Sequence, residues 1–313
     1  MRVVLFHRKY RRFHGGHLKV WHYFNHVLAM PGFDARVHFD INSSWDSSNP
    51  WAQTPDRVVD SVDNVSPDAL FVAGRDWQRL DGLGLLDRGI PVLNLIQHVR
   101  HAEEWSIQSG YLDRKAIRLC VSQQVANAVE EAGSRGATVV IPNGMDVPVF
   151  EPVFPSVRPI DLFIAGLKQP VLAAQAAERL IASGQSIEVL TDHVPRDVFL
   201  DFMRRSRVTL FLPNDEEGFY LPALEGMALG TIVVCPDCVG NRSFCLPGVN
   251  AFRPAFRFDD MVRDVEIALT LEEPAAKPIL RAAAETARQH SLESERQRFG
   301  QVLADLDALW ASS

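Results

Sequence analysis

The sequence predicts an α/β protein of two domains, each built on a parallel β-sheet. Short apolar runs alternate with helical patterns along the chain, and this alternation is typical of parallel sheets covered by helices on both faces. The chain has 313 residues, of which 47% are hydrophobic, and ~100–200 residues per domain leaves room for two cores. Residues 151–159 carry three prolines, which indicates an extended linker between the domains.

The first domain is expected to span residues 1–152. Its strands are predicted at residues 3–6, 35–39, 69–73, 91–96, 119–121 and 138–141. The first strand leads through a basic loop and the pair Gly15-Gly16 into a helix, and a later helix is expected to begin after an N-cap at Ser122.

The second domain is expected to span residues 153–290, followed by a terminal segment at residues 291–313. Its strands are predicted at residues 160–165, 186–190, 208–213 and 231–235, and its helices at residues 171–183, 196–205 and 221–229. Residues 291–310 have the pattern of one amphipathic helix, with Phe299, Val302, Leu303, Leu306, Leu309 and Trp310 on its apolar side. Such a stripe needs a large apolar surface to pack on.

Composition excludes several classes of protein. A net charge of −7 speaks against a nucleic-acid binder, and four cysteines are too few for a disulfide-built scaffold. Cys235 and Cys238 have zinc-like spacing but lack a second pair, so free thiols are expected. The apolar run at residues 3–6 is too short for a signal-peptide core and no stretch approaches a membrane span, so the expected location is the cytoplasm.

Positive charge gathers near the start of the chain. Residues 1–33 contain no Asp or Glu, and the loop at residues 7–14 carries Arg8, Lys9, Arg11 and Arg12. The loop is either simply solvated or faces an anionic partner. In the second case the partner is an acceptor bearing phosphate, carboxylate or sulfate, or an anionic membrane surface that holds a lipid-linked acceptor.

The most informative motif lies at residues 213–230 and contains Glu217 and Glu225, with seven residues between them. It follows an apolar strand. Gly218 allows a tight turn after the first carboxylate, Pro222 suits the first turn of a helix, and Gly230 suits the end of that helix. The pattern therefore predicts one carboxylate on a loop at the sheet edge and the other on the helix behind it.

This segment resembles the glutamate, seven residues, glutamate motif of family 4 retaining glycosyltransferases. Gly218-Phe219, Leu224-Glu225, Met227-Ala228 and Gly230 stand where that family has its glycine, phenylalanine, leucine, alanine and glycine, and residues 141–146 and 248–251 are weaker echoes. The resemblance implies the GT-B fold, in which two Rossmann-like domains face each other across a cleft and a C-terminal helix crosses back to the N-domain.

The resemblance also implies roles for single residues. Glu225 would accept hydrogen bonds from the ribose hydroxyls of a nucleotide, and Glu217 would contact hydroxyls of the donor sugar. The implied catalytic set is Glu217, His98 and Lys168, with His101 and Arg100 as substitutes for His98. The implied donor-binding set is Gly15, Gly16, Gly166, Lys168, Gly218, Phe219, Leu221, Glu225 and Arg242.

The chain departs from the family in the cations expected near the diphosphate. The family pattern is Gly-Arg followed by Lys, and this chain has Gly166-Leu167-Lys168. Because a leaving nucleoside diphosphate gathers negative charge, Lys168 would act alone or with Arg242. Asp305 and Asp307 have the spacing of a metal-binding pair but lie within the predicted terminal helix, so neither a metal nor another cofactor is expected.

The function implied is transfer of a sugar from a nucleoside-diphosphate sugar to an acceptor hydroxyl, with retention of anomeric configuration. The acceptor would be a glycan, a lipid-linked molecule or a small molecule, and the protein would be cytoplasmic or peripheral at the inner membrane face. The alternatives are a non-catalytic nucleotide-sugar-binding subunit and a GT-B nucleotide-sugar epimerase, whose product stays on the nucleotide.

Overall fold

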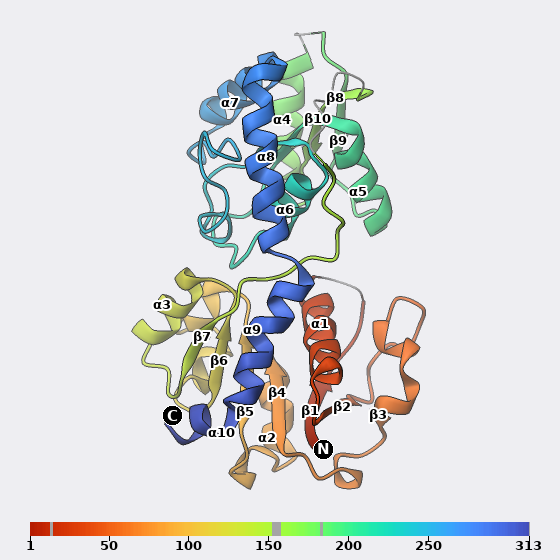
Figure 1. Cartoon of the computed structure of the whole chain (residues 1–313), viewed down its shortest axis with the longest axis vertical. Helices are drawn as coiled ribbons and strands as arrows, with labels where there is room; N and C mark the ends of the chain where they lie inside the picture. The colour runs from red at the N-terminus through yellow and green to blue at the C-terminus, as the bar shows by residue number, and fades with distance from the viewer. Residues whose placement is uncertain (13–14, 152–157, 182–183, 313) are drawn as a thin grey trace. The chain divides into compact units, whose positions relative to one another are not determined.

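The computed structural model describes residues 1–12, 15–151, 158–181 and 184–312. The chain divides into two compact α/β units, of which the first comprises Met1–Asn143 and Leu292–Ser313 and the second comprises Gly144–Ser291 (Figure 1). The division falls at Asn143 and Gly144, whereas the proline pattern placed it at residues 152 and 153. Most of the expected proline linker lies outside the described residues.

The first unit is built on a seven-stranded parallel sheet with strand order β3-β2-β1-β4-β5-β6-β7. The strands are β1 (Arg2–Arg8), β2 (Phe33–Phe39), β3 (Val58–Val59), β4 (Ala69–Ala73), β5 (Val92–Ile96), β6 (Ile117–Cys120) and β7 (Thr138–Val140). All but the short β3 were predicted from the sequence. The strand order reverses between β1 and β4, and in open α/β sheets ligands bind at the carboxyl edge beside such a reversal.

Helices cover both faces of this sheet. They are α1 (Gly15–Ala29), α2 (Asp76–Gly82), α3 (Gln123–Glu131), α9 (Leu292–Ala304) and α10 (Leu306–Ala311). Short 3₁₀ segments join them: η1 (Pro50–Gln53), η2 (Pro55–Arg57), η3 (Val62–Asn64), η4 (Leu86–Arg88), η5 (Val99–Ala102) and η6 (Ser109–Tyr111). Ser122 caps α3 as expected, since its side chain accepts a hydrogen bond from the amide of Val125 at 3.3 Å.

The alternation of side chains along β1 and β4 produces two core layers. Phe6 and Phe71 stack with ring centroids 4.5 Å apart, and Phe6 also meets Phe24 of α1. The next residues in each strand, Leu5 and Leu70, belong instead to the apolar cluster around α2. Because successive strand residues point to opposite faces, α1 and α2 lie on opposite sides of the sheet.

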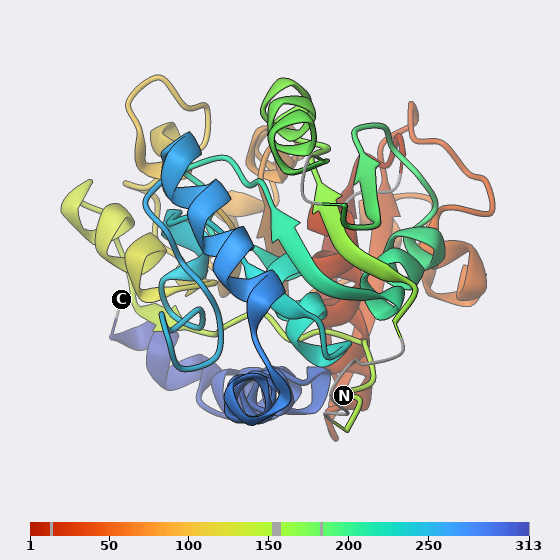
Figure 2. The same ribbon diagram turned by 90° about the horizontal axis from the view of Figure 1, so that it is seen from above.

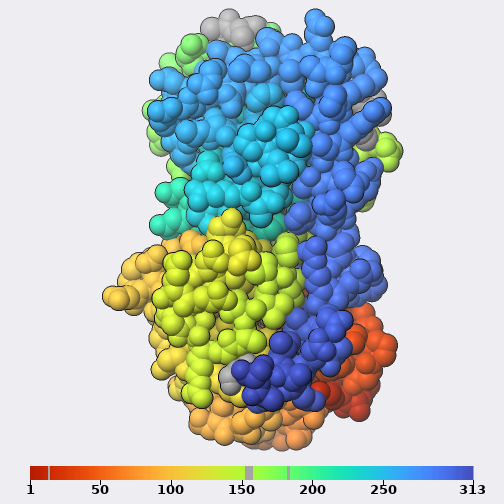
Figure 3. All heavy atoms as spheres, turned by 60° about the vertical axis from the view of Figure 1, so that its left-hand side comes forward, coloured from red at the N-terminus to blue at the C-terminus, as the bar shows by residue number. Residues whose placement is uncertain are grey.

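The C-terminal helices α9 and α10 pack within the first unit, and Figure 3 shows them, in dark blue, at its surface. Phe299 of α9 is fully buried and meets Tyr23 of α1 edge to face at 4.8 Å. Sequence had predicted a single helix at residues 291–310, but the helix is interrupted at Asp305, and α10 begins at Leu306.

A buried charge cluster joins α9 to α1. Lys19 donates a hydrogen bond to Oε2 of Glu295 at 2.7 Å, and His26 Nε2 lies 3.2 Å from the same oxygen. Burial alone would raise the pKa of Glu295, but Lys19 and His26 outweigh it and hold the pKa below its usual value. Neither Lys19 nor Glu295 is more than 1% exposed, so each depends on the other for compensation.

The second unit is built on a four-stranded parallel sheet with strand order β11-β10-β8-β9. Its strands are β8 (Ile160–Ala165), β9 (Ile187–Leu190), β10 (Ser206–Phe211) and β11 (Ile232–Val234), and its helices are α4 (Pro170–Ile181), α5 (Arg196–Arg205), α6 (Leu221–Ala228), η7 (Val239–Asn241), α7 (Phe258–Thr270) and α8 (Glu273–Gln289). Figure 2 shows α4 and α7 on one side of this sheet and α5 and α6 on the other. Ala276 and Leu280 of α8 share the core cluster of α4 and α7.

Replacing Glu295 by leucine is expected to lower the free energy of unfolding of the first unit by ~3–5 kcal/mol, because Lys19 would remain buried without its partner. The double variant Lys19→Met/Glu295→Leu removes both charges and should recover most of the loss. Urea unfolding followed by tryptophan fluorescence measures this unit selectively, since all six tryptophans lie in it. Glu293→Leu, at an exposed position of α9, is the control, and a double variant no more stable than Glu295→Leu would contradict the assignment.

Candidate functional site

The carboxyl edge of the second unit's sheet brings Lys168 and Glu217 together. Strands β8 and β10 are neighbours, and their last residues Ala165 and Phe211 are register partners, so the segments that follow leave the sheet side by side. The ammonium group of Lys168 hydrogen-bonds to Oε1 of Glu217 and lies 5.4 Å from the ring centroid of Tyr220. Two of the predicted site residues, 49 positions apart, thus form one ion pair.

Gly166 is required by packing at the turn from β8 to α4. A Cβ atom added there would lie 2.2 Å from Cβ of Ala173, well inside van der Waals contact. The amide of Gly166 donates to Leu190 O at 2.9 Å, which fixes the turn against β9. The close packing of the helix on the strand end therefore determines where Lys168 leaves the sheet.

The backbone of the Glu217 loop is held by a second turn, at η7. The amide of Tyr220 donates to Gly240 O at 2.9 Å, and the amide of Val239 donates to Asp215 O at 2.9 Å. A Cβ atom at Gly240 would lie 2.7 Å from Glu217 O. The two turns therefore touch through backbone atoms, and a glycine is needed at the contact.

The buried side chain of Asn241 holds the η7 turn in shape. Its Nδ2 donates to Pro236 O at 2.9 Å, and its Oδ1 accepts from the amide of Cys238 at 3.2 Å. These bonds satisfy buried backbone groups of the turn. All four cysteines of the chain are free and buried, and in the described ranges no cluster of three or more His, Cys, Asp or Glu side chains has the arrangement of a metal site.

Gly218, Phe219 and Leu221 join the Glu217 loop to α6. The ring of Phe219 packs against Phe244 and His290, with centroids 5.0 and 5.8 Å away. Its side chain is 8% exposed and anchors the loop, so a donor contact at this position would come from the backbone. Gly218 is buried, Leu221 is half-buried at the start of α6, and Gly230 ends that helix in the left-handed conformation, as its position in the motif predicted.

Glu225 lies inside the second unit and is paired with Arg196. It is only 4% exposed, and Nη1 of Arg196 donates to its Oε1 at 2.5 Å. Burial raises the pKa of Glu225, and the neighbouring guanidinium opposes part of that rise. The other end of the Arg196 guanidinium, Nη2, donates to Oδ1 of Asp146 at 2.5 Å.

Neither Arg196 nor Asp146 was among the residues selected from the sequence. Asp146 ends the weaker family echo at residues 141–146, which was a usable signal. Arg196 is the first residue of α5 and belongs to no motif, so nothing in the sequence indicated its contact with Glu225.

Arg242, the expected second cation, is exposed and held by a neighbouring carboxylate. Its Nη2 donates to Oδ2 of Asp237 at 2.7 Å, and Nε of Arg253 lies 3.3 Å from the other oxygen of Asp237. Any contact of Arg242 with a phosphate would therefore compete with Asp237.

In the first unit, Gly15 and Gly16 form the start of α1. Gly15 is exposed, and a Cβ atom there would meet no other atom within 4 Å. The amides at this helix end are suited to an anion, because the first turn of a helix leaves backbone donors without intrahelical partners. Residues 13–14, which precede them in the basic loop, lie outside the described residues.

The expectation that Arg8 belongs to an exposed positive surface was wrong. Arg8 is 7% exposed; its Nη1 donates to Oδ2 of Asp76 at 2.5 Å, and its Nη2 lies 2.8 Å from Nδ1 of His17. Asp76 follows β4, which pairs with β1 in the sheet. The pairing of these strands therefore places a carboxylate beside Arg8, although no Asp or Glu is near Arg8 in the sequence. Lys9 is likewise 3.7 Å from Asp40, whereas Arg11 and Arg12 are exposed.

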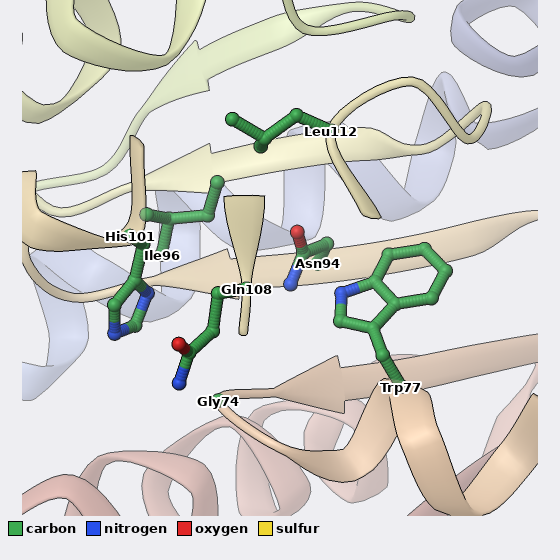
Figure 4. A pocket seen from close by; sticks show the side chains of 7 residues that line it. All are labelled: Gly74, Trp77, Asn94, Ile96, His101, Gln108 and Leu112. Atoms are coloured by element: carbon green, nitrogen blue, oxygen red, sulfur yellow. The ribbon is translucent and has the colours of Figure 1, made fainter. Parts of the chain in front are cut away.

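His98 and His101 occupy the segment that follows β5. His98 caps η5, since its Nδ1 accepts a hydrogen bond from the amide of Arg100 at 3.1 Å. His101 rather than His98 lines a small pocket, together with Gly74, Trp77, Asn94, Ile96, Gln108 and Leu112 (Figure 4). Burial, followed by the charges of His98 and Arg100, lowers the pKa of His101 to about 4, so this imidazole is neutral at physiological pH.

Comparison with known proteins identifies the fold. Residues 120–267 match the family described as "Glycosyl transferases group 1". Among solved structures, sucrose-phosphate synthase from Thermosynechococcus elongatus superposes with a TM-score of 0.73 at 14% identity, covering 98% of this chain and 100% of that one. No curated protein sequence matches the chain.

Two further solved structures are similar over nearly the whole chain. Anabaena HepE in complex with UDP and glucose has a TM-score of 0.74 at 14% identity, with 97% of this chain and 100% of that chain covered. The lipopolysaccharide outer core galactosyltransferase WaaB has a TM-score of 0.69 at 13% identity, with 97% and 99% covered. The chain therefore has the GT-B fold, as the sequence predicted.

We expect Gly240→Ala to disturb the Glu217 loop, because the added methyl would overlap Glu217 O and the amide of Phe219. An overpacked contact of this kind costs ~1–3 kcal/mol. Thermal unfolding should therefore shift down, and proteolysis within residues 214–220 should become faster. Gly110→Ala, at an exposed glycine with open space around it and no positive φ, controls for loss of a glycine elsewhere, and equal effects of the two variants would contradict the tight contact.

Proposed function

We propose that this protein is a glycosyltransferase that moves a sugar from a nucleoside-diphosphate sugar to an acceptor hydroxyl. One observation carries the proposal: the segment that matches the glycosyltransferase family places a buried carboxylate, Glu225, and the ion pair of Lys168 and Glu217 on segments that leave the carboxyl edge of one parallel sheet. Carboxylates accept hydroxyl hydrogen bonds strongly, and a lysine beside them supplies a cation for a phosphate.

In the proposed complex Glu225 accepts hydrogen bonds from the ribose hydroxyls, and Glu217 contacts the donor sugar. Lys168 moves from Glu217 toward the diphosphate as negative charge gathers on the leaving group. The amides at the start of α1 and the imidazole of His98 are the contributions proposed for the first unit. HepE has been solved with UDP-glucose, and a nucleotide of that class is the first donor to test.

The finer proposal is transfer with retention of configuration, as in family 4 enzymes, without a metal. Retention would follow if the acceptor attacks the anomeric carbon from the face that the diphosphate leaves. The leaving phosphate can then take the acceptor proton, so no enzymic nucleophile is needed, and the protein supplies positioning and electrostatic stabilisation. The anomeric configuration of a product formed from an α-linked donor, read by NMR, tests this point.

The acceptor proposed is a glycan, a lipid-linked molecule or a small molecule that carries an anionic group. Arg11 and Arg12 remain exposed at the carboxyl edge of the first unit's sheet and could attract such a group or an anionic membrane. No helix among the described residues is long and apolar enough to cross a membrane. The location proposed is the cytoplasm or the inner membrane face.

A second candidate function is a nucleotide-sugar-binding subunit without catalysis. Leu167 stands where the family has its arginine, so the cations proposed for the diphosphate are Lys168 and the Asp237-bound Arg242. Incubation with labelled donor and a panel of acceptors separates the two functions, because only a transferase moves label to an acceptor. An epimerase would instead change the sugar while it stays on the nucleotide.

The first test is a thermal-shift screen against UDP, ADP, GDP, CDP and TDP. A specific ligand at 100 times its Kd stabilises the folded state by ~2.7 kcal/mol, so one diphosphate should raise the melting temperature well above the rest. Equal and negligible shifts with all five would contradict nucleotide binding.

Glu225→Ala is expected to weaken binding of the diphosphate that this screen identifies, by roughly tenfold or more for loss of charge-assisted hydrogen bonds. Glu217→Ala should leave diphosphate binding nearly unchanged and lower turnover of the intact donor. Isothermal titration and a transfer assay measure the two effects. Glu216→Ala, in the same loop, is the control, and wild-type affinity and turnover in both variants would refute the site.

In the basic loop, Arg8 is expected to contribute to stability and Arg11 and Arg12 to binding. Arg8→Ser should destabilise the first unit by ~3–5 kcal/mol, because Asp76 would remain buried without its cation. Arg11→Ser/Arg12→Ser should leave stability unchanged and weaken binding to anionic liposomes or to an anionic acceptor at low salt. The difference should shrink as salt rises, since exposed charges are screened within ~8–10 Å. Unchanged affinity at low salt would leave the loop without a binding role.

A further inference from the structure

Arg196 joins two carboxylates of the second unit that are far apart in sequence. Its Nη1 donates to Glu225 and its Nη2 to Asp146, each at 2.5 Å. Arg196 lies in the first turn of α5, Glu225 in α6, and Asp146 in the segment where the chain enters the second unit. One guanidinium therefore connects three separate elements.

The orientation of this guanidinium is fixed from both ends. A planar fork that binds two acceptors has little rotational freedom. The segment carrying Asp146 is itself tied down, because the amide of Met145 donates to His290 O at 2.9 Å. The Arg196 side chain is 29% exposed and that of Glu225 only 6%, so the pair is largely shielded from water.

Arg196 engages only one oxygen of the Glu225 carboxylate. Both the hydrogen bond and the ion pair are made to Oε1. An ionised carboxylate offers about four acceptor positions, so Oε2 keeps its capacity for hydroxyl donors while Arg196 stays bound. The contact is therefore compatible with a ribose on the same carboxylate.

We propose that Arg196 is a positioning residue for nucleotide binding, which holds the Glu225 carboxylate ionised and in a fixed orientation while ribose hydroxyls bind to it. The inference rests on the proposed function, since the ribose contact of Glu225 belongs to that proposal. Arg196 lies outside the motif, and its positive charge explains how a carboxylate so deeply buried can serve as an acceptor.

The charged and titratable groups around Glu225 determine what loss of Arg196 would do. Burial raises the pKa of Glu225, the charge of Asp146 raises it further, and Arg196 opposes both. The phenol of Tyr220 is buried with its own pKa raised well above the ordinary value, so it stays neutral. Without Arg196 the pKa of Glu225 would rise, and a protonated carboxyl would lose acceptor strength.

Loss of Arg196 should therefore weaken nucleotide binding most at low pH. In Arg196→Gln the carboxyl is protonated over a range in which the wild-type carboxyl is ionised, so nucleotide binding is weakened most at the acidic end of that range. As pH rises the variant carboxyl ionises, and its affinity approaches that of the wild type. A residue that merely joined α5 to α6 would change the melting temperature without this pH dependence.

The test is titration of UDP, or of whichever diphosphate stabilises the wild-type chain, into wild type, Arg196→Gln, Arg196→Lys and Arg204→Gln from about pH 6 to about pH 9. Arg204 lies on the same helix and pairs with exposed Asp201, so Arg204→Gln is the matched control. Protonation of the nucleotide affects all variants equally. The ratio of each variant's Kd to that of wild type therefore reports only the effect of the substitution in the protein.

For each unit by which loss of Arg196 raises the pKa of Glu225, the Kd of Arg196→Gln should exceed that of wild type by up to about tenfold at the acidic end. The ratio should fall steadily toward the alkaline end. Arg196→Lys keeps the charge and should show a nearly flat ratio, as should Arg204→Gln. Arg196→Gln/Glu225→Gln should bind no more weakly than Glu225→Gln alone, since both changes act on one contact.

Two results would overturn the inference alone. One is wild-type or tighter binding by Arg196→Gln, which would mean that Arg196 competes with the ribose; the other is a Kd ratio that is constant across pH. Absence of binding of all five diphosphates to the wild-type chain would overturn the proposed function, and the inference with it.

Discussion

The burial of Glu225 is the constraint on which the site of the second unit depends. A carboxylate that is 4% exposed cannot remain charged unless another group compensates it. Arg196 supplies that compensation, and Asp146 in turn fixes Arg196. The start of α5, the middle of α6 and the entry of the chain into the unit are therefore positioned together around one charge.

The rest of the site follows from how the strands end. Ala165 and Phe211 are register partners, so Lys168 and Glu217 leave the sheet next to each other and pair. Gly166 and Gly240 permit contacts that any side chain would prevent, and the buried Asn241 holds the η7 turn against the Glu217 loop. The polar groups thus lie on backbone that is fixed by packing, which reduces the reorganisation needed when a ligand binds.

Local sequence patterns predicted most of the strands and helices, because these elements are encoded by apolar period and by caps, whereas the GT-B arrangement came from the family resemblance. Ser122 and Gly230 fulfil the capping roles that their positions predicted. Partnerships between charges were not predictable in this way. Arg8 meets Asp76 because β1 and β4 are neighbours, and Arg196 meets Glu225 because α5 packs on α6. Both contacts are determined by the order of the strands in the sheet and by helix packing, which no single stretch of sequence encodes.

The same distinction applies to the residues near His98. Sequence placed a histidine after β5 correctly, but the choice between His98 and His101 depends on the course of the 3₁₀ segment that follows. His98 caps that segment, and His101 lines the pocket beside Trp77 and Asn94.

The most direct measurement is a crystal structure of the chain with the nucleoside diphosphate that it binds. We expect the ribose hydroxyls to donate to Glu225, Arg196 to remain bound to the same carboxylate, and Lys168 to have left Glu217 for a phosphate oxygen. A nucleotide bound elsewhere, or bound with Glu225 contacting only Arg196, would contradict the assignment of this site to nucleotide-sugar transfer.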